Sequence, residues 1–435
     1  MNCLSNTINR INKSDIGHRI ASGAFWSMVG TALSKVFVLI GGMFCARILG
    51  KEGFGEFGMI RSTISMFVVF GTAGLGLTAT KHIAEFLKTA KEKIPSIYML
   101  TNGFATITGG IVVVLVLLLS DYLVNNTLNS PQLLTSLRFG ALLLFVTVLN
   151  GAQFGTLSGF ENFKAIAQNN VIGGIAETVF MLLGAYYYGV EGAVLGFGMG
   201  FVCLFIANQY SINNTFKNYG IKIDRKLFYR QDLKLLYKFS LPAMLSSLLV
   251  TPVMWGIRAI LVNHDDFGEL ANFEIATQWR LIILFVPSAV GQIVLPILSS
   301  INSSDRQKFW KVLKYNLMLN VSVSFCIALL VCICSPLIVS FYGDDFTNPY
   351  PLIVLAFSTI FSSIASVVGM SIQSRAKIWT GFLFNLLWAT MVCSLSYFFV
   401  KQGYGSTGLS LAILISYIVH SILQLIYLKT VVSNS

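Results

Sequence analysis

The chain has 435 residues, of which 55% are hydrophobic and only 11% are charged, and its mean hydropathy is +0.73. This composition excludes a soluble globular protein, because a water-exposed surface of this size would carry far more charge. The formal net charge of +12 raises the question of nucleic-acid binding, and the answer depends on where that charge lies.

Apolar runs of about 20 residues recur along the whole chain, and each can cross a bilayer core of about 30 Å as a helix. We therefore predict an all-α membrane protein with about twelve transmembrane helices. They cover residues 22–46, 54–80, 98–120, 133–154, 164–187, 190–209, 239–262, 270–298, 314–336, 348–370, 378–399 and 406–428.

Positive charge marks one side of the predicted membrane. If the N-terminus is cytoplasmic, 22 of the 30 Lys and Arg residues fall in cytoplasmic segments, three in outer loops and five inside spans. This asymmetry follows the positive-inside rule and predicts that both termini are cytoplasmic. The basic loops set the topology and contact anionic lipid headgroups, so the net charge does not indicate a nucleic-acid partner.

The predicted spans divide six and six around a basic link. We expect a cytoplasmic N-terminal segment at 1–21, a first half at 22–209, a linker at 210–238, a second half at 239–428 and a cytoplasmic tail at 429–435. The tripeptide Phe54-Gly55-Glu56 recurs as Phe267-Gly268-Glu269, 213 residues later, at the start of the second span of each half. This echo favours two parallel repeats with a cargo path between them.

Charges deep inside the predicted spans are mostly cationic, and only two acids, Glu177 and Glu274, are comparably placed. A charge at bilayer depth costs about 3 kcal/mol even on lenient scales, so it is usually kept for function. An interior that favours cations predicts an anionic cargo. The candidate cargo-binding residues are Lys35, Arg61, Arg280, Arg258 and Arg138.

Depth in the membrane ranks these five cations. Lys35 and Arg280 lie near the middle of their spans and are the first candidates, followed by Arg61. Arg138 and Arg258 lie closer to the outer interface, where snorkelling to headgroups is an equally open interpretation.

The two buried acids have open roles. Glu177 is either a proton-coupling carboxyl or the structural partner of a cation. Glu274 lies six residues before Arg280, a spacing that does not favour a pair between them on one helix. No cysteine and histidine cluster has metal-ligand spacing, so we expect no metal and no cofactor.

Polar amides inside the spans also have two interpretations, as contacts to sugar hydroxyls or as hydrogen bonds between helices. They are Asn150, Gln153, Asn169, Asn170, Gln278 and Asn385.

Several short motifs resemble those of Wzx-type polysaccharide flippases. They are Ala46-Arg47-Ile48-Leu49-Gly50, Phe54-Gly55, Gly74-Leu75-Gly76 with Lys81, the run Gly155 to Lys164, Phe239-Ser240-Leu241-Pro242 and Leu295-Pro296. The resemblance covers nearly the whole chain. It implies the MATE-like fold of the multidrug/oligosaccharidyl-lipid/polysaccharide exporter superfamily. It also implies movement of undecaprenyl-pyrophosphate-linked oligosaccharide, such as O-antigen or capsule units, between the leaflets of the bacterial inner membrane.

This resemblance leads to a non-enzymatic, ion-coupled flippase, with membrane lipids, a polysaccharide polymerase and a chain-length regulator as its further partners. A drug or cation antiporter on the same fold is the first alternative, and the cation-rich spans argue against it. A membrane polymerase or ligase is the second alternative. Its catalytic groups would need a long outer loop, whereas the longest predicted one spans only 121–132.

Overall fold

The computed structural model describes residues 15–72, 74–222, 249–288, 306–374 and 378–432. Every regular element within these ranges is a helix, as predicted for an all-α protein. The α-helices are α2 (Asp15–Thr72), α3 (Leu75–Thr89), α4 (Ile94–Tyr122), α5 (Leu134–Gly159), α6 (Phe163–Asn218), α9 (Val250–His264), α10 (Phe267–Ile283), α12 (Arg306–Ile333), α13 (Ser335–Ser340), α14 (Tyr350–Ser374), α15 (Ile378–Lys401) and α16 (Gly405–Tyr427). Short 3₁₀ or π turns lie at Lys91–Lys93, Leu123–Thr127, Pro131–Leu133 and Leu428–Val432.

Eight of the described helices are long and apolar enough to cross a membrane. Of these eight, α6 contains two predicted spans, and α2 contains the span 22–46 and most of 54–80, whose end lies in α3. The eight together therefore account for ten of the twelve. The other two predicted spans correspond to α9 and α10, and parts of both spans lie outside the described residues. The chain is a multi-pass membrane protein.

Backbone breaks divide the two longest helices where the sequence predicts a change of span. In α2 the break is at Gly50, with φ 71° and ψ 178°. In α6 it is at Tyr188 and Gly189, where Gly189 has φ 59°. Positive φ is available to glycine at little steric cost, which explains why each turn ends at a glycine.

The chain forms two compact units that do not coincide with a simple cut of the sequence. Unit 1 contains Met1–Gly41, Phe67–Ser120 and Thr135–Leu245, and unit 2 contains Gly42–Met66, Asp121–Leu134 and Ser246–Ser435. The α2 helix therefore contributes to both units. The predicted border at 210–238 lies largely outside the described residues, so that border remains a prediction.

In unit 1, the two arms of α6 pack against each other through glycines spaced four residues apart. A Cβ at Gly192 would lie 2.1 Å from the carbonyl oxygen of Gly184, and one at Gly196 would lie 2.1 Å from that of Phe180. A Cβ at Gly200 would meet Glu177 at 2.5 Å. Residues four apart share one helix face, so these glycines form a flat strip that allows close helix contact without bulky side chains.

Gly196→Leu should prevent this contact. No flexible side-chain end lies in the way, because the nearest atoms are backbone atoms of Phe180 and Met181. We expect a loss of folded protein, measured as the monodisperse fraction after detergent extraction. Gly110→Leu is the matched control, because a Cβ at Gly110 meets nothing within 4 Å. Equal yields of the two variants would contradict the packing role of Gly196.

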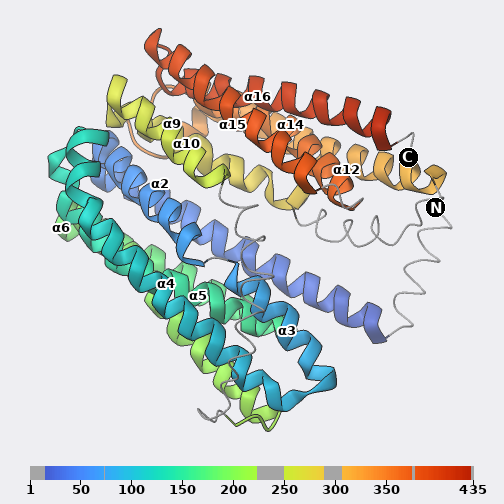
Figure 1. The fold of residues 1–435 in the computed structure, drawn as a ribbon. Coiled ribbons are helices and arrows are strands. Elements are labelled where there is room, and N and C mark those ends of the chain that lie inside the picture. Colours follow the sequence, from blue (N-terminus) through green and yellow to red (C-terminus); the bar gives the residue numbers. More distant parts are fainter. Residues whose placement is uncertain (1–14, 73, 223–248, 289–305, 375–377, 433–435) are drawn as a thin grey trace. The chain divides into compact units, whose positions relative to one another are not determined.

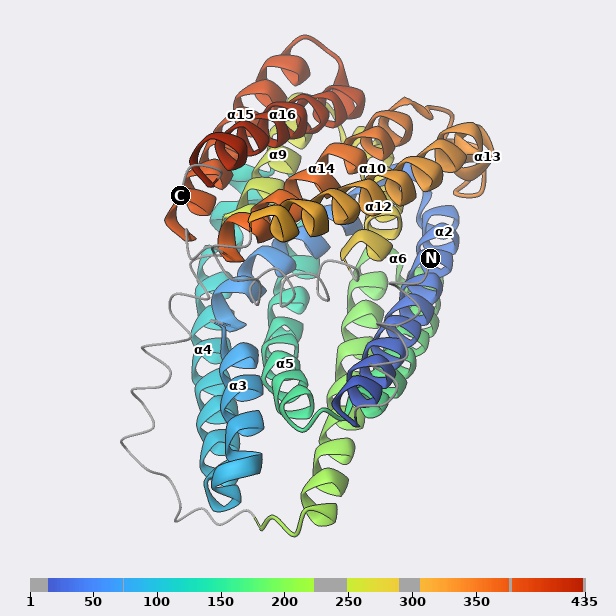
Figure 2. The ribbon, with the colours of Figure 1, turned by 90° about the vertical axis from the view of Figure 1, so that its right-hand side faces the viewer.

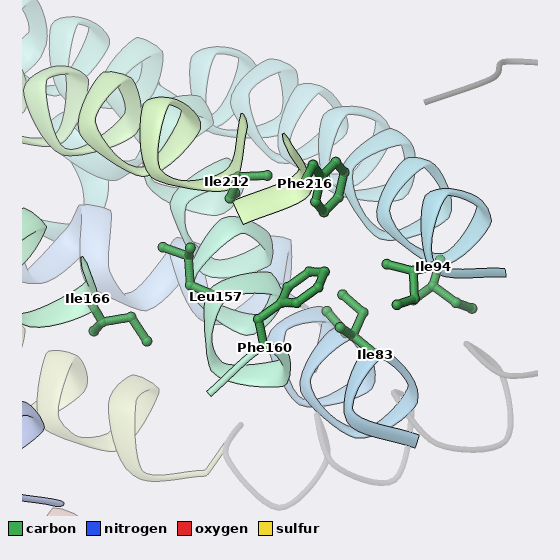
Figure 3. Packing of buried hydrophobic residues seen from close by; sticks show 9 residues of the cluster. Ile83, Ile94, Leu157, Phe160, Ile166, Ile212 and Phe216 are labelled. Atoms are coloured by element: carbon green, nitrogen blue, oxygen red, sulfur yellow. The ribbon is translucent and has the colours of Figure 1, made fainter. Parts of the chain in front are cut away.

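The core of unit 1 lies where α3, α4, α5 and α6 meet (Figure 2). Side chains from all four helices interdigitate there (Figure 3). The buried cluster is Ala79, Ile83, Ile94, Ile97, Leu157, Phe160, Ile166, Ile212 and Phe216.

Unit 2 is a bundle in which α14 packs against α10, α12 and α16, and α15 packs against α9 and α16 (Figure 1). Its buried apolar cluster is Phe309, Leu313, Val367, Val368, Ile372 and Leu428. Polar side chains are also buried inside this bundle, and they include the charged groups of the candidate site.

Candidate functional site

Two arginines share one buried carboxylate in unit 2. The Nε of Arg258 donates to Oε1 of Glu274 at 2.6 Å, and an Nη of Arg61 donates to Oε2 at 3.1 Å. The exposed fraction of the side chain is 7% for Arg258, 2% for Glu274 and 23% for Arg61. This ion triad has two positive charges and one negative charge, and sequence reasoning did not foresee it.

Small residues allow the helices to approach at this triad. A Cβ at Gly58 would lie 2.6 Å from Cγ of Glu274, so this glycine leaves room for the carboxylate side chain. A Cβ at Gly55 would overlap the carbonyl oxygen of Phe267. The indole Nε1 of Trp255 also donates to Oγ1 of Thr63 at 3.0 Å. These contacts hold the 42–66 segment of α2 against α9 and α10.

The sequence echo explains the position of the triad. Arg61 lies seven residues after Phe54, and Glu274 lies seven residues after Phe267, so the pair is separated by the same 213 residues as the two tripeptides. Arg61 and Glu274 therefore occupy equivalent positions of the proposed repeat. The sequence signal that could have predicted this pair is the 213-residue offset itself, applied two helical turns beyond the repeated tripeptides.

Arg280 lies six residues further along α10, about 9 Å along the helix axis from Glu274, and makes separate contacts. Its Nη donates to Oγ of Ser362 at 3.4 Å, and its Cζ lies 5.3 Å from the centroid of the Tyr417 ring. Tyr417 packs in turn against Trp388 and His420. Arg280 and Glu274 do not pair, as their spacing predicted.

The Arg280 guanidinium is only partly satisfied. Its Nε is buried and has no hydrogen-bond partner, as is the case for Nε1 of Trp388 and Nδ1 of His420. Among the described residues, no carboxylate lies within ion-pair distance of Arg280. The Arg280 side chain therefore presents an uncompensated positive charge beside aromatic rings and unpaired hydrogen-bonding groups.

Lys35 is in a similar state in unit 1. It is half-buried on α2, and none of the described residues forms a hydrogen bond or ion pair with it. The neighbouring carbonyl oxygen of Phe37 accepts from Oγ1 of Thr178 at 3.0 Å, so this part of α2 is packed against α6. Lys35 and Arg280, the two cations that the sequence ranks first, thus have no carboxylate partner among the described residues.

The remaining predicted site residues differ in their surroundings. Arg138 is exposed, and its Nε donates to Oγ of Ser120 at 3.3 Å. Glu177 is half-buried on the first arm of α6, next to Gly200 of the second arm.

Three of the six polar amides form hydrogen bonds between helical segments. Asn150 donates to the carbonyl oxygen of Phe201 at 3.0 Å, and Gln153 donates to Gln209 at 3.0 Å. Asn169 donates to Asn208 at 2.9 Å. These bonds support the interpretation of these three amides as contacts between helices in unit 1.

The turn between α9 and α10 is acidic. Oδ1 of Asp266 accepts from the backbone N–H of Glu269 at 2.7 Å and caps the start of α10. Partial burial raises the pKa of the neighbouring Asp265 carboxyl, and the nearby negative charges of Glu269 and Asp266 raise it further. This cap fixes where α10 begins, and thereby the register that brings Glu274 to Arg258.

Comparison with known proteins gives a consistent result. A family model described as polysaccharide biosynthesis protein matches residues 20–302. The chain is 27% identical over 195 residues to the EPS I polysaccharide export inner membrane protein EpsE of Ralstonia nicotianae, and the match covers 43% of this chain and 44% of that protein. The matched part thus spans less than half of the length of this relative.

A longer match is found with a protein of Shigella flexneri named "Putative O-antigen transporter". The two chains are 24% identical over 407 residues, which cover 90% of this chain and 94% of that protein. The relatives are named as export proteins or transporters, which agrees with the prediction of a transporter rather than an enzyme.

Solved structures identify the fold. An inward-facing multidrug resistance MATE family transporter of the MOP superfamily superimposes with a TM-score of 0.81 at 17% identity, over 94% of this chain and 98% of that one. A MOP superfamily transporter from Pyrococcus furiosus, described as having a binding pocket of reversed polarity, gives a TM-score of 0.72 at 16% identity, over 98% of this chain and 97% of that one. At these identities the likeness shows the fold alone, and it confirms the predicted MATE-like architecture.

Proposed function

The chain belongs to the polysaccharide biosynthesis protein family, and from this premise we propose that it is a flippase for a lipid-linked oligosaccharide. The cargo would pass from the inner to the outer leaflet of the cytoplasmic membrane during surface polysaccharide synthesis. The proposal agrees with a MATE-like fold and with relatives named for polysaccharide export and O-antigen transport.

One observation carries the choice of cargo. Arg280 places a positive charge in a membrane-spanning helix bundle, with a buried Nε that has no partner and with the centroid of the Tyr417 ring 5.3 Å from its Cζ. A guanidinium stays charged and donates paired hydrogen bonds to phosphate oxygens. A cationic drug would be repelled by this group, whereas an anionic headgroup would be attracted to it.

The chemistry of undecaprenyl pyrophosphate suits this site. Its pyrophosphate carries roughly two negative charges near neutral pH, and the attached sugars offer hydroxyls and flat faces to amides and aromatic rings. Lys35, in unit 1, is a further proposed cargo-binding cation. Arg61, Arg258 and Arg138 complete the proposed cation set, and Glu177 is the proposed coupling carboxyl.

The proposal includes an orientation and partners. Both termini lie in the cytoplasm, as the positive-inside pattern of the loops indicates. The chain then receives its cargo on the side where sugars are assembled. It delivers the cargo to a polysaccharide polymerase and its chain-length regulator on the other side.

Deletion of the gene in its own host tests the function. We expect loss of surface polysaccharide and accumulation of undecaprenyl-pyrophosphate-linked repeat units that remain inaccessible from the outer face of spheroplasts. A plasmid copy of the wild-type chain should reverse both effects. Normal surface polysaccharide together with increased sensitivity to cationic drugs would instead support the antiporter.

A further inference from the structure

We propose that Arg61 and Arg258 form an anion-binding site which Glu274 fills as an internal ligand, and that a phosphate of the cargo replaces the Glu274 carboxylate there. The inference rests on the proposed function, because the lipid pyrophosphate is the exchanging anion. It adds a role for Glu274, a protein group that competes with the cargo.

In the ion triad, the two arginines hold the Glu274 carboxylate in the way that they would hold a bound anionic ligand. Each oxygen of the Glu274 carboxylate accepts from a different arginine, at 2.6 Å from Arg258 and 3.1 Å from Arg61. Phosphate oxygens accept the same charge-assisted hydrogen bonds from guanidinium groups. Two guanidinium groups face one carboxylate, so the site retains a net positive charge when Glu274 occupies it and attracts a second anion.

Both arginines are held by groups other than Glu274. Arg258 donates from an Nη to the carbonyl oxygen of Met254 at 2.7 Å, and its Cζ lies 5.1 Å from the ring centroid of Phe273. The Cζ of Arg61 lies 5.8 Å from the ring centroid of Phe57. These contacts stabilise the positions of the cations, so the site is built to persist when the carboxylate leaves.

The exposure of the three side chains indicates the order of exchange. Arg61 is 23% exposed, whereas Arg258 and Glu274 are 7% and 2% exposed. An incoming phosphate reaches Arg61 first and weakens the longer of the two ion pairs. Return of the Glu274 carboxylate then displaces the phosphate, which gives the site a built-in means of release.

The test measures binding of two probes, inorganic pyrophosphate and undecaprenyl pyrophosphate, to the purified full-length chain in detergent. We expect Glu274→Gln to bind both probes at least tenfold more tightly than the wild type, because the competing charge is gone. Adding Arg61→Ala to this variant should remove the gain. Glu56→Gln is the matched control, because Glu56 lies on the same 42–66 segment as Arg61 and accepts from Gln132 rather than from a cation.

Each outcome decides one claim. Equal affinity of Glu274→Gln and wild type for both probes, or a gain that survives Arg61→Ala, would overturn the exchange. A gain for inorganic pyrophosphate without any binding of the lipid would keep the site and reject the proposed cargo. If Glu274→Gln does not fold, Glu274→Asp retains the charge on a shorter side chain. We expect a smaller gain from it in the same direction, and unchanged or weaker binding would overturn the inference.

Discussion

Replacing Arg280 by alanine is expected to remove most of the surface polysaccharide while the protein still inserts into the membrane. The guanidinium has no carboxylate partner among the described residues and only one long hydrogen bond, to Ser362, so its removal leaves no buried acid unpaired. A charge-assisted hydrogen bond contributes about 1.5–3 kcal/mol. Loss of one such contact to the cargo headgroup would therefore reduce transport by roughly 10- to 100-fold.

Matched variants separate charge from structure at this position. Arg280→Lys should retain part of the export, because lysine keeps the charge but lacks the planar fork. Lys35→Ala should cause a loss like that of Arg280→Ala, whereas Lys401→Ala, an exposed cation at the end of α15, should have no effect. Surface polysaccharide is measured by gel electrophoresis, and membrane insertion by immunoblotting. Normal export in both alanine variants at positions 35 and 280 would contradict the cation-lined path.

Reversal of charge at Glu274 should have the largest effect on stability. Glu274→Arg places three guanidinium groups together, two of them at buried positions, and leaves Arg258 without its 2.6 Å carboxylate. Breaking a buried ion pair in this way costs about 3–5 kcal/mol. We expect a marked loss of folded protein, measured by thermal unfolding in detergent.

Swapping the charges of Arg61 and Glu274 tests their direct pairing, and with it the equivalence of the two positions in the proposed repeat. Arg61→Glu combined with Glu274→Arg restores opposite charges at two positions that the 213-residue offset makes equivalent. The double variant should recover more than half of the stability lost in Glu274→Arg, and a coupling energy follows from the double-mutant cycle. A double variant that is as unstable as the sum of its single changes would contradict direct pairing.

The transmembrane architecture could largely be predicted from the sequence, because apolar length and loop charge are local properties. The turn at Gly189, for example, lies in the predicted gap between residues 187 and 190. Depth within a span ranked Lys35 and Arg280 first as candidate cargo-binding residues, and that role stays a prediction. The MATE-like fold followed from the resemblance of short motifs rather than from apolar length.

Contacts within the site could not be predicted in the same way. Arg258 reaches Glu274 only because the capped turn after Asp265 sets the register of α10 against α9. The ring of Tyr417 comes to Arg280 from α16, which is 137 residues further along the chain, and its position depends on how the bundle packs. No local sequence pattern indicates a contact between two residues that lie so far apart in the chain.

Transport in a purified system tests the central claim most directly. The full-length chain is reconstituted into vesicles with undecaprenyl-pyrophosphate-linked oligosaccharide from its host, and the sugar that reaches the opposite leaflet is quantified with a membrane-impermeant lectin. We predict that the wild type moves the cargo and that Arg280→Ala, reconstituted to the same level, moves it roughly 10- to 100-fold more slowly. Equal movement of the cargo by the wild type and by Arg280→Ala would contradict the role of Arg280. Equal movement in vesicles with the wild type and in vesicles without protein would contradict the flippase function.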